Sequence, residues 1–219
     1  MSPSERSVLF LGKADDAHVG RAVEFCRLNF ATVSTYLGRW DDPLPDGAAA
    51  WTGDLIISYL ARWVVPGGLL ARAAIAINFH PGSPEYPGYG CNNFAIYEGA
   101  TDFGVTCHHM APRVDTGAII EVRRFPVLPS DNAGTLLARA YDFQIVLFYG
   151  VVGRIIRGED LPVSRETWAR KPFTRKQFSE LGRMSSSMTE QEIAKRKRAL
   201  EVGALKPRVS DLVPWTVGA

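Results

Sequence analysis

The sequence predicts an α/β protein whose mostly parallel sheet is flanked by helices. Four short runs, at residues 7–12, 31–37, 54–60 and 73–80, are rich in apolar or β-branched residues. Strands that read as continuous apolar runs are typical of parallel sheets that are buried on both faces. Helical or looped segments separate the four runs, as the crossover connections between parallel strands require.

Three helical patterns accompany these strands. Apolar residues recur at helical spacing over residues 17–29, which predicts a helix after the first strand. The segment "NNFAIYEG" predicts a short helix that Gly99 ends. A long helix is predicted over residues 130–159, with a Ser or Asp N-cap and Gly158 near its end. Its apolar residues lie nearly all round the helix, so we expect it to be largely buried.

Two further strands are predicted at 102–110 and 118–127, as an antiparallel pair joined by "APRVDTG". The composition becomes polar and basic after about residue 160. We therefore expect a main domain over residues 1–160 and a C-terminal extension of helix and loop over 161–219, packed on that domain.

One helix is expected within the extension. The segment "SMTEQEIAKRKRAL" has Thr189 in the N-cap position and Glu192 in the position that completes a capping box.

The composition limits the classes of function. The chain has 219 residues, of which 46% are hydrophobic and 22% charged, which suits one folded domain. A net charge of +2 predicts no nucleic-acid surface. Three cysteines without CxxC spacing indicate a reducing compartment and no metal finger. No signal-peptide core is present and no apolar stretch approaches a membrane span, so we expect a cytoplasmic protein without metal or membrane association.

The polar residues that end the fourth strand carry the chemistry. Asn78 and His80 alternate with Phe79, so both side chains point to one side of the strand. In open α/β sheets, ligands bind outside the carboxyl ends of the strands. Asp115, in a loop between two strands, can return to that edge. Asn78, His80 and Asp115 together would supply a hydrogen-bond donor, a proton shuttle and a carboxylate to hold the imidazole. The alternative for a single histidine at a strand end, which is the commoner case, is a capping residue whose hydrogen bonds are satisfied.

Three motifs in order resemble the folate-dependent formyltransferases, a family that includes glycinamide ribonucleotide, methionyl-tRNA and nucleotide-sugar formyltransferases. They are "DLIISYLARWVVPGGLL", "INFHPGSPEYPGYG" and "FGVTCHHMAPRVDTGAII", within about residues 50–125. The resemblance implies a Rossmann-like formyltransferase fold. It also implies transfer of a formyl group from N10-formyltetrahydrofolate to a primary amine, without metal or covalent intermediate, by the catalytic triad Asn78, His80 and Asp115. No serine or cysteine stands in a nucleophile-elbow motif, which agrees with direct transfer.

The same resemblance implies a folate-binding wall. The "ARWVVPGG" loop matches the segment that brackets the pterin ring, although core packing is an equal reading for its two valines. His108 and His109 lie on opposite faces of their strand, so that one is expected to face the folate and the other to be exposed. Gly117 is expected to permit a tight turn. The folate contacts implied are Trp63, Val64, Val65, Pro66, His108 and Gly117.

The identity of the amine follows from departures within the family. The chain is too short for the C-terminal barrel with which methionyl-tRNA enzymes hold tRNA. "FLGKADDAHVG" lacks the glycine-rich phosphate loop of the glycinamide ribonucleotide enzymes. "HPGSPEYPGYG" and the polar tail resemble the nucleotide-sugar N-formyltransferases of surface polysaccharide (O-antigen) synthesis. We therefore expect a nucleotide-linked amino dideoxy sugar, with glycinamide ribonucleotide or another small amine as the alternative.

Two other classes are weaker. A folate-binding protein without turnover would not need all three triad residues, and a dinucleotide oxidoreductase would need GxGxxG after the first strand. Whether the chain forms a homodimer stays open. The residues expected at the sugar nucleotide are Tyr86, Tyr89 and Asn92, with Arg113, Lys171 and Arg175 at the diphosphate; ordinary packing is the alternative for each.

Overall fold

A computed structural model describes residues 5–202 and confirms the α/β class. Its sheet has six strands in the order β2-β1-β3-β4-β5-β6. The pairs β1–β2, β1–β3 and β3–β4 are parallel. The pair β5–β6 is antiparallel, as expected, and β4–β5, for which no direction was predicted, is antiparallel as well. The strands are β1 (Ser7–Lys13), β2 (Thr32–Gly38), β3 (Gly53–Tyr59), β4 (Ala73–His80), β5 (Asp102–His109) and β6 (Ile119–Pro126).

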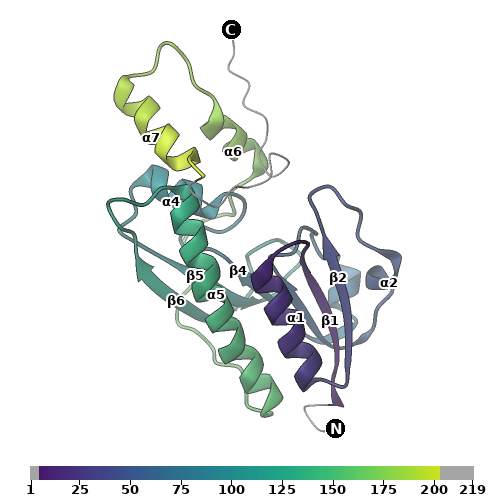
Figure 1. Cartoon of the computed structure of the whole chain (residues 1–219). Coiled ribbons are helices and arrows are strands. Elements are labelled where there is room, and N and C mark those ends of the chain that lie inside the picture. The colour runs from purple at the N-terminus through teal and green to yellow at the C-terminus, as the bar shows by residue number, and fades with distance from the viewer. Residues whose placement is uncertain (1–4, 203–219) are drawn as a thin grey trace.

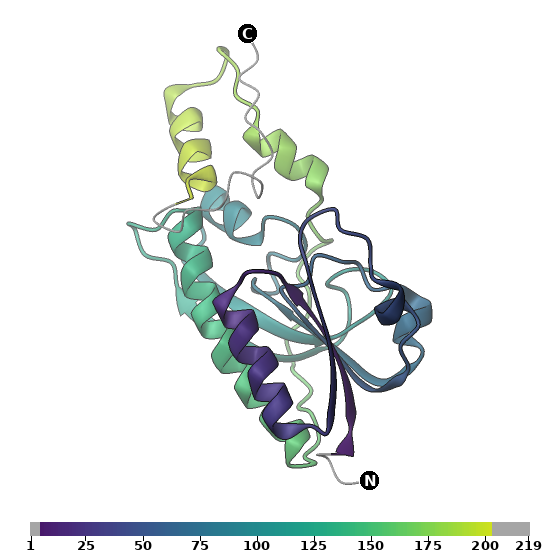
Figure 2. The same cartoon turned by 45° about the vertical axis from the view of Figure 1, so that its right-hand side comes forward.

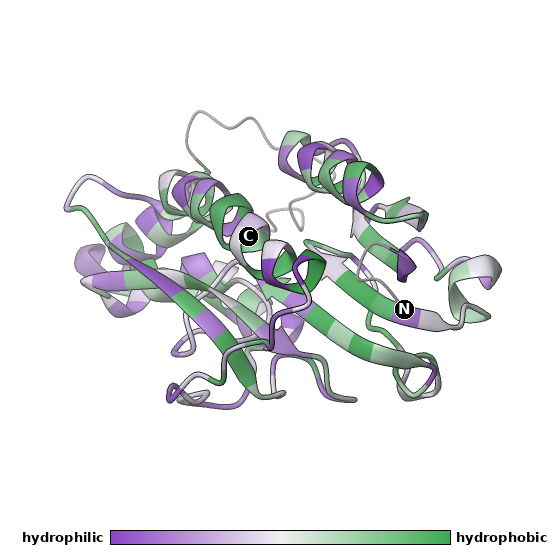
Figure 3. Ribbon diagram, turned by 90° about the horizontal axis from the view of Figure 1, so that it is seen from below, coloured by the Kyte–Doolittle hydropathy of each residue, from purple (hydrophilic) through white to green (hydrophobic). Residues whose placement is uncertain are grey.

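Helices cover both faces of this sheet (Figure 1). α1 (Ala17–Asn29) and α5 (Ala133–Ile156) lie side by side on one face, and the views in Figures 1 and 2 agree on this. The short helices α2 (Asp46–Ala49) and α3 (Gly67–Leu70), which the sequence pattern did not predict, belong to the opposite face. The central strands are mostly hydrophobic, whereas the helices carry residues of both kinds (Figure 3).

Alternation along the central strands divides the core into two clusters. In β1, Val8 and Phe10 pack in the cluster beneath α1 and α5, whereas Leu9 and Leu11 pack beneath α2 and α3. Phe79 of β4 follows the first pattern and contacts the aromatic core. Its neighbours in β4 consequently point away from that core.

α5 begins later than predicted. Its N-cap is Asn132, which forms a capping box with Thr135. Asp131 is instead buried and paired with Arg139 at 2.7 Å, so its carboxylate is not free to cap the helix. Gly158, at φ 71°, follows the last turn as expected.

α5 is also less buried than its composition predicts, because Val146 is 50% exposed. Within the described chain, α5 is the helix long and apolar enough to span a membrane by length and composition. The expectation that no apolar stretch reaches this length is therefore wrong. Half of the apolar window is buried against the rest of the protein, because a core helix between a sheet and neighbouring helices needs apolar residues on several sides.

The described residues after α5 form two helices, α6 (Arg175–Gly182) and α7 (Glu190–Leu200), which lie above α4 (Cys91–Glu98) in Figure 1. α7 packs against α4. Residues 203–219 of the expected extension lie outside the described residues.

The cap of α7 is only partly as expected. Thr189 accepts from the Glu192 N–H at 3.2 Å, as an N-cap should. The Glu192 carboxylate does not complete a capping box, because it binds Tyr97 at 2.8 Å and Arg196 at 2.6 Å.

Candidate active site

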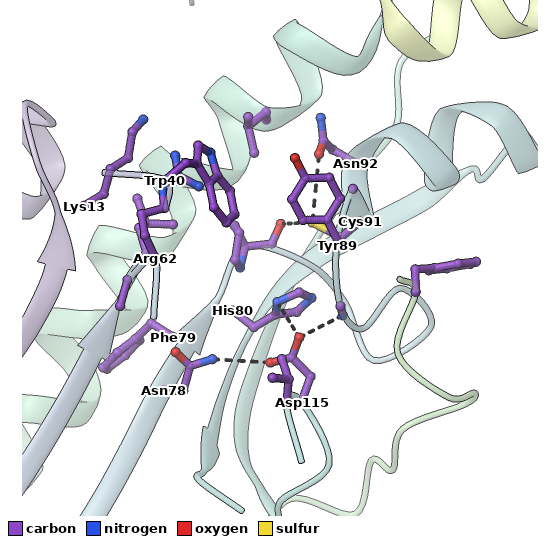
Figure 4. A pocket seen from close by; sticks show the side chains of 18 of the residues that line it. Lys13, Trp40, Arg62, Asn78, Phe79, His80, Tyr89, Cys91, Asn92 and Asp115 are labelled. Atoms are coloured by element: carbon purple, nitrogen blue, oxygen red, sulfur yellow. Dashed lines mark hydrogen bonds and ion pairs between the residues drawn. The ribbon is translucent and has the colours of Figure 1, made fainter. Parts of the chain in front are cut away.

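The structure brings Asn78, His80 and Asp115 together at the end of β4 (Figure 4). His80 Nδ1 lies 3.2 Å from Asp115 Oδ2, and Asn78 Nδ2 donates to Asp115 Oδ1 at 3.4 Å. His80 and Asp115 are both buried. Alternation places the first two side chains on one side of β4, and the loop between β5 and β6 returns Asp115 to them.

His108 belongs to the same cluster. It lies opposite Asn78 in the antiparallel pairing of β4 with β5. Its Nε2 is 3.2 Å from Asp115 Oδ1 and 3.0 Å from Asn78 Nδ2, and its Nδ1 is 2.8 Å from the His109 carbonyl oxygen. His108 is buried, whereas His109 is exposed. Two imidazole rings therefore face one carboxylate.

Asp115 is ionised in this setting. Burial by itself would raise its pKa, but the facing His80 ring, the His108 hydrogen bond and the Gly88 amide together lower the pKa to about 2. The carboxylate thus stays negative at every pH near neutrality.

The second nitrogen of His80 also has a partner. Nε2 lies 2.9 Å from the Tyr86 carbonyl oxygen, while Nδ1 faces Asp115. Both contacts are hydrogen bonds only when both ring nitrogens carry protons, because both partners are acceptors. The tight loop after β4 thus orients the ring.

The cluster opens into a cavity of about 1210 Å³. Small-molecule pockets commonly enclose about 300–1000 Å³, so this cavity is larger than a pocket for one small molecule usually is. The lining runs from the β3–α3 loop, through Asn78, His80 and Asp115, to Arg175 and Phe178 of α6.

A family model described as formyl transferase matches residues 41–152, just over half of the chain. The chain belongs to the formyl transferase family. A methionyl-tRNA formyltransferase from Levilactobacillus brevis is 30% identical over 115 residues, which are 52% of this chain and 37% of that protein. One from Listeria welshimeri is 34% identical over 89 residues, 40% of this chain and 28% of that protein. The matched part of the chain thus spans only 28% to 37% of the length of these curated relatives.

Solved structures with this fold cover nearly the whole chain. A candidate sugar N-formyltransferase from Mycobacterium tuberculosis superposes with a TM-score of 0.74 at 22% identity, covering 91% of this chain and 89% of that one. The Helicobacter canadensis N-formyltransferase, solved with folinic acid and dTDP-3-aminofucose, gives 0.71 at 20% identity, with 88% and 80% coverage. At such identities the likeness establishes the fold.

The predicted folate wall of this formyl transferase chain is partly in the cavity. Trp63, Val64 and Val65 line it, and Trp63 donates to the Asp42 carbonyl at 2.9 Å. Val64 is exposed, whereas Val65 is buried and also packs in the smaller core cluster. Pro66 does not line the cavity, and it precedes α3 as the N-cap.

Gly117 also does not line the cavity. A close contact with the neighbouring backbone explains why this residue is a glycine. A Cβ atom at this position would lie 1.8 Å from the His109 carbonyl oxygen. The loop between β5 and β6 therefore needs glycine for space. It does not need it for a left-handed turn, because the residue with positive φ in this loop is Asp115, at 47°.

Of the residues predicted to contact the sugar, two line the cavity and one does not. Tyr89 and Asn92 line the cavity, but the Asn92 amide is buried and donates to the Ala133 carbonyl at 2.8 Å. The Tyr86 ring lies outside the lining and packs against Phe103, at 5.9 Å between ring centroids. Only its carbonyl group reaches the cluster of Asn78, His80 and Asp115, through the contact with His80 Nε2.

A cationic and aromatic group at the cavity wall was expected from the sequence only in part: Tyr89 and Arg175 were predicted at the substrate, whereas Trp40 and Arg62 were not. The Arg62 guanidinium lies 4.1 Å and that of Arg175 4.8 Å from the Trp40 ring centroid, and the Tyr89 ring lies 5.4 Å from Trp40. Figure 4 shows Trp40 and Arg62 beside each other. Arg62 directly precedes the predicted pterin wall, which was a usable signal; Trp40 lies in a proline-rich loop that offered none.

Of the three basic residues predicted at the diphosphate, two line the cavity and one does not. Arg113 and Arg175 line the cavity, whereas Lys171 is exposed outside it.

Cys91 lines the cavity, but burial raises the pKa of its thiol to about 12, which leaves no thiolate for nucleophilic attack. Within residues 5–202, no three His, Cys, Asp or Glu side chains are grouped to hold a metal ion.

Proposed function

We propose that this chain transfers the formyl group of N10-formyltetrahydrofolate to the primary amine of a nucleotide-linked amino sugar. One observation carries the proposal: the Asp115 carboxylate lies 3.2 Å from His80 and 3.4 Å from Asn78, at the wall of a cavity large enough for both substrates. Such a cluster supplies a donor, a titratable ring and a fixed negative charge.

The reaction needs each of these groups. The amine nitrogen attacks the formyl carbon, forming the new C–N bond, and the bond from that carbon to N10 breaks. The amine loses a proton and N10 gains one. Asn78 stabilises the negative charge that develops on the formyl oxygen, together with the His80 ring when that ring is protonated. Asp115 stabilises the positive ring and fixes its orientation.

The acceptor of the amine proton has two candidates. One is the neutral form of His80, whose ring already lies at the reaction centre. The other is a water molecule held by the ionised Asp115. Either acceptor passes the proton towards N10, so that the enzyme returns to its starting charge.

The loop after β3 suits the folate. A reduced pterin is a flat array of hydrogen-bond donors and acceptors, which backbone groups recognise well. Leu60 takes a left-handed conformation, with φ 53°, and turns the chain along the cavity so that residues 60–65 form one wall. Trp63 supplies a flat apolar surface within that wall.

The group around Trp40 suits a nucleotide. A base stacked on an aromatic ring gains about 1–3 kcal/mol, and a guanidinium binds phosphate oxygens in a bidentate manner. Trp40 and Tyr89 provide rings, and Arg62 and Arg175 provide guanidinium groups, at one wall of the cavity. A sugar linked to a nucleoside diphosphate combines these recognition needs with the amine.

Glycinamide ribonucleotide is the less favoured substrate, because the first helix offers its phosphate no free N-terminus. Asp16 Oδ1 accepts from the N–H groups of His18 and Val19 at 3.0 and 3.3 Å. Lys13 binds the same carboxylate at 3.2 Å. The groups that would bind a phosphate are thus occupied by the protein's own anion.

The test is a panel of amines incubated with N10-formyltetrahydrofolate, with tetrahydrofolate release as the readout. The panel contains dTDP- and UDP-linked amino sugars, glycinamide ribonucleotide and methionyl-tRNA. We expect transfer to at least one sugar nucleotide, and transfer to glycinamide ribonucleotide or methionyl-tRNA alone would contradict the proposal. His80→Ala should abolish transfer while donor binding is retained. Donor binding without transfer to any amine would instead identify a non-catalytic folate-binding protein.

A further inference from the structure

We propose that Trp168, in the segment between α5 and α6, is a positioning residue for the two active-site histidines and the Asp115 loop. Its ring centroid lies 5.1 Å from that of His108, at an interplanar angle of 87°, and 6.0 Å from that of His80, at 68°. Its indole N–H donates to the Gly117 carbonyl at 2.8 Å. The kinetic part of this inference rests on the proposed function.

These three contacts reach every element that supplies the catalytic cluster. His80 ends β4, His108 lies in β5, and Gly117 belongs to the loop that carries Asp115. Asp115 binds the two histidines through their nitrogens, whereas Trp168 meets both rings in edge-to-face geometry. An aromatic ring packed in this way limits rotation of the imidazoles about χ2, which hydrogen bonds alone leave broad.

The hydrogen bond to Gly117 acts on the carboxylate. Asp115 has φ 47°, a left-handed conformation that a residue other than glycine keeps only when its surroundings impose it. Gly117 is held from one side by its close approach to the His109 carbonyl and from the other by the Trp168 indole. This second anchor keeps the short loop folded with Asp115 towards the histidines.

Trp168 is itself fixed by the chain that follows it. Ala169 N–H donates to the Pro84 carbonyl at 3.1 Å, and Phe173 N–H donates to the Pro87 carbonyl at 2.9 Å. These bonds join the segment after α5 to the loop that follows β4. Trp168 thus reaches the histidines from a backbone that is held in place, as a positioning group requires.

The alternative is that Trp168 only covers apolar surface. In that case its replacement would lower the stability of the fold without a specific effect on Asp115 or on turnover. Trp168→Phe keeps an aromatic ring and removes the N–H group, whereas Trp168→Leu removes both. Trp51→Phe is the matched control, because Trp51 is partly buried against the smaller core cluster and does not line the cavity.

The first measurement is amide hydrogen exchange, which needs no substrate. The Gly88 N–H donates to Asp115 Oδ2 at 2.8 Å, so its protection reports the position of the carboxylate. We expect exchange at Gly88 to rise about fivefold in Trp168→Phe, and further in Trp168→Leu, while the β1 amides are unchanged. Trp51→Phe should leave Gly88 exchange at the wild-type rate. Equal protection of Gly88 in all four proteins would overturn the inference.

The second measurement separates kcat from KM. In Trp168→Phe we expect kcat to fall about tenfold with an unchanged KM for the formyl donor, at a temperature where all variants are folded. A kcat equal to that of wild type would overturn the positioning role. If the wild-type protein transfers formyl to no amine, the proposed function fails, and the exchange result at Gly88 still decides the Trp168 inference.

Discussion

The Gly88 N–H donates to Asp115 Oδ2 at 2.8 Å and thereby joins the loop after β4 to the loop that carries the carboxylate. Gly88 has φ 88°, and a Cβ there would meet the Phe173 carbonyl oxygen at 2.4 Å. The glycine is therefore required twice, for its conformation and for space. The proline- and glycine-rich loop after β4 thus brings a backbone N–H group to the carboxylate of the candidate active site.

Gly88→Ala should destabilise the protein by at least about 1–3 kcal/mol, because a side chain at positive φ is strained and the neighbouring backbone has no room. The measurement is the free energy of unfolding in urea. Gly20→Ala is the control: Gly20 lies within α1, and a Cβ added there would have no neighbouring atom within 4 Å, so alanine should stabilise the fold by roughly 0.5–1 kcal/mol. Similar unfolding energies for the two variants would contradict this account of Gly88.

Asp115→Asn should lower the rate of formyl transfer by about 10²–10⁴-fold, because the amide keeps the shape of the carboxylate and loses the charge that stabilises the protonated His80 ring. Binding of the formyl donor should change little. Single-turnover kinetics and donor titration measure the two effects separately. A variant with the wild-type rate would show that the charge of Asp115 takes no part in the reaction.

The lowered pKa of Asp115 also predicts how stability depends on pH. A carboxyl whose pKa falls from 3.8 to about 2 on folding stabilises the native state fully above the unfolded value. That contribution, on the order of 2 kcal/mol, disappears as the pH falls from about 4 to about 2. Urea unfolding across this window should show a steeper loss for wild type than for Asp115→Asn. Parallel curves would mean that Asp115 has an ordinary pKa.

Trp40→Ala should raise the KM for the proposed sugar-nucleotide substrate about tenfold, because one stacked base is worth about 1–3 kcal/mol. It should leave the KM for the formyl donor unchanged. Lys171→Ala is the comparison, since Lys171 is exposed outside the cavity lining and should not affect either constant. A larger effect at Lys171 than at Trp40 would place the nucleotide elsewhere.

The strands were predictable because they are short runs rich in apolar or β-branched residues, most of which end beside a glycine, a proline or a polar residue. The N-cap residue of α5 could not be predicted, because Ser130, Asp131 and Asn132 are all good N-caps. The pairing of Asp131 with Arg139 decides among them, and it forms only once the helix exists. α6 was missed because its signal is a capping box, Thr174 with Gln177, in a segment with few apolar residues.

In the candidate active site too, some residues were predictable from local sequence patterns and others were not. Asn78 and His80 share a side of β4 through local alternation, and a motif singled out Asp115. Trp168 carries no spacing signal, and it meets the histidines only because the chain returns to the sheet edge after α5. The Trp40 and Arg62 pair also depends on two loops meeting in space. Contacts between distant loops are set by the whole fold, which local patterns do not encode.

The return of the chain after α5 has a consequence for biosynthesis. Phe173 bonds to both Pro87 and Tyr89 through its backbone, so the loop beside His80 lacks these partners until the ribosome has made the chain as far as residue 173. In a nascent chain whose sheet is already formed, the imidazole rings of His80 and His108 would still lack their contacts with Trp168 and the segment after α5. The proposed formyl transfer should therefore begin only when this segment has emerged and docked.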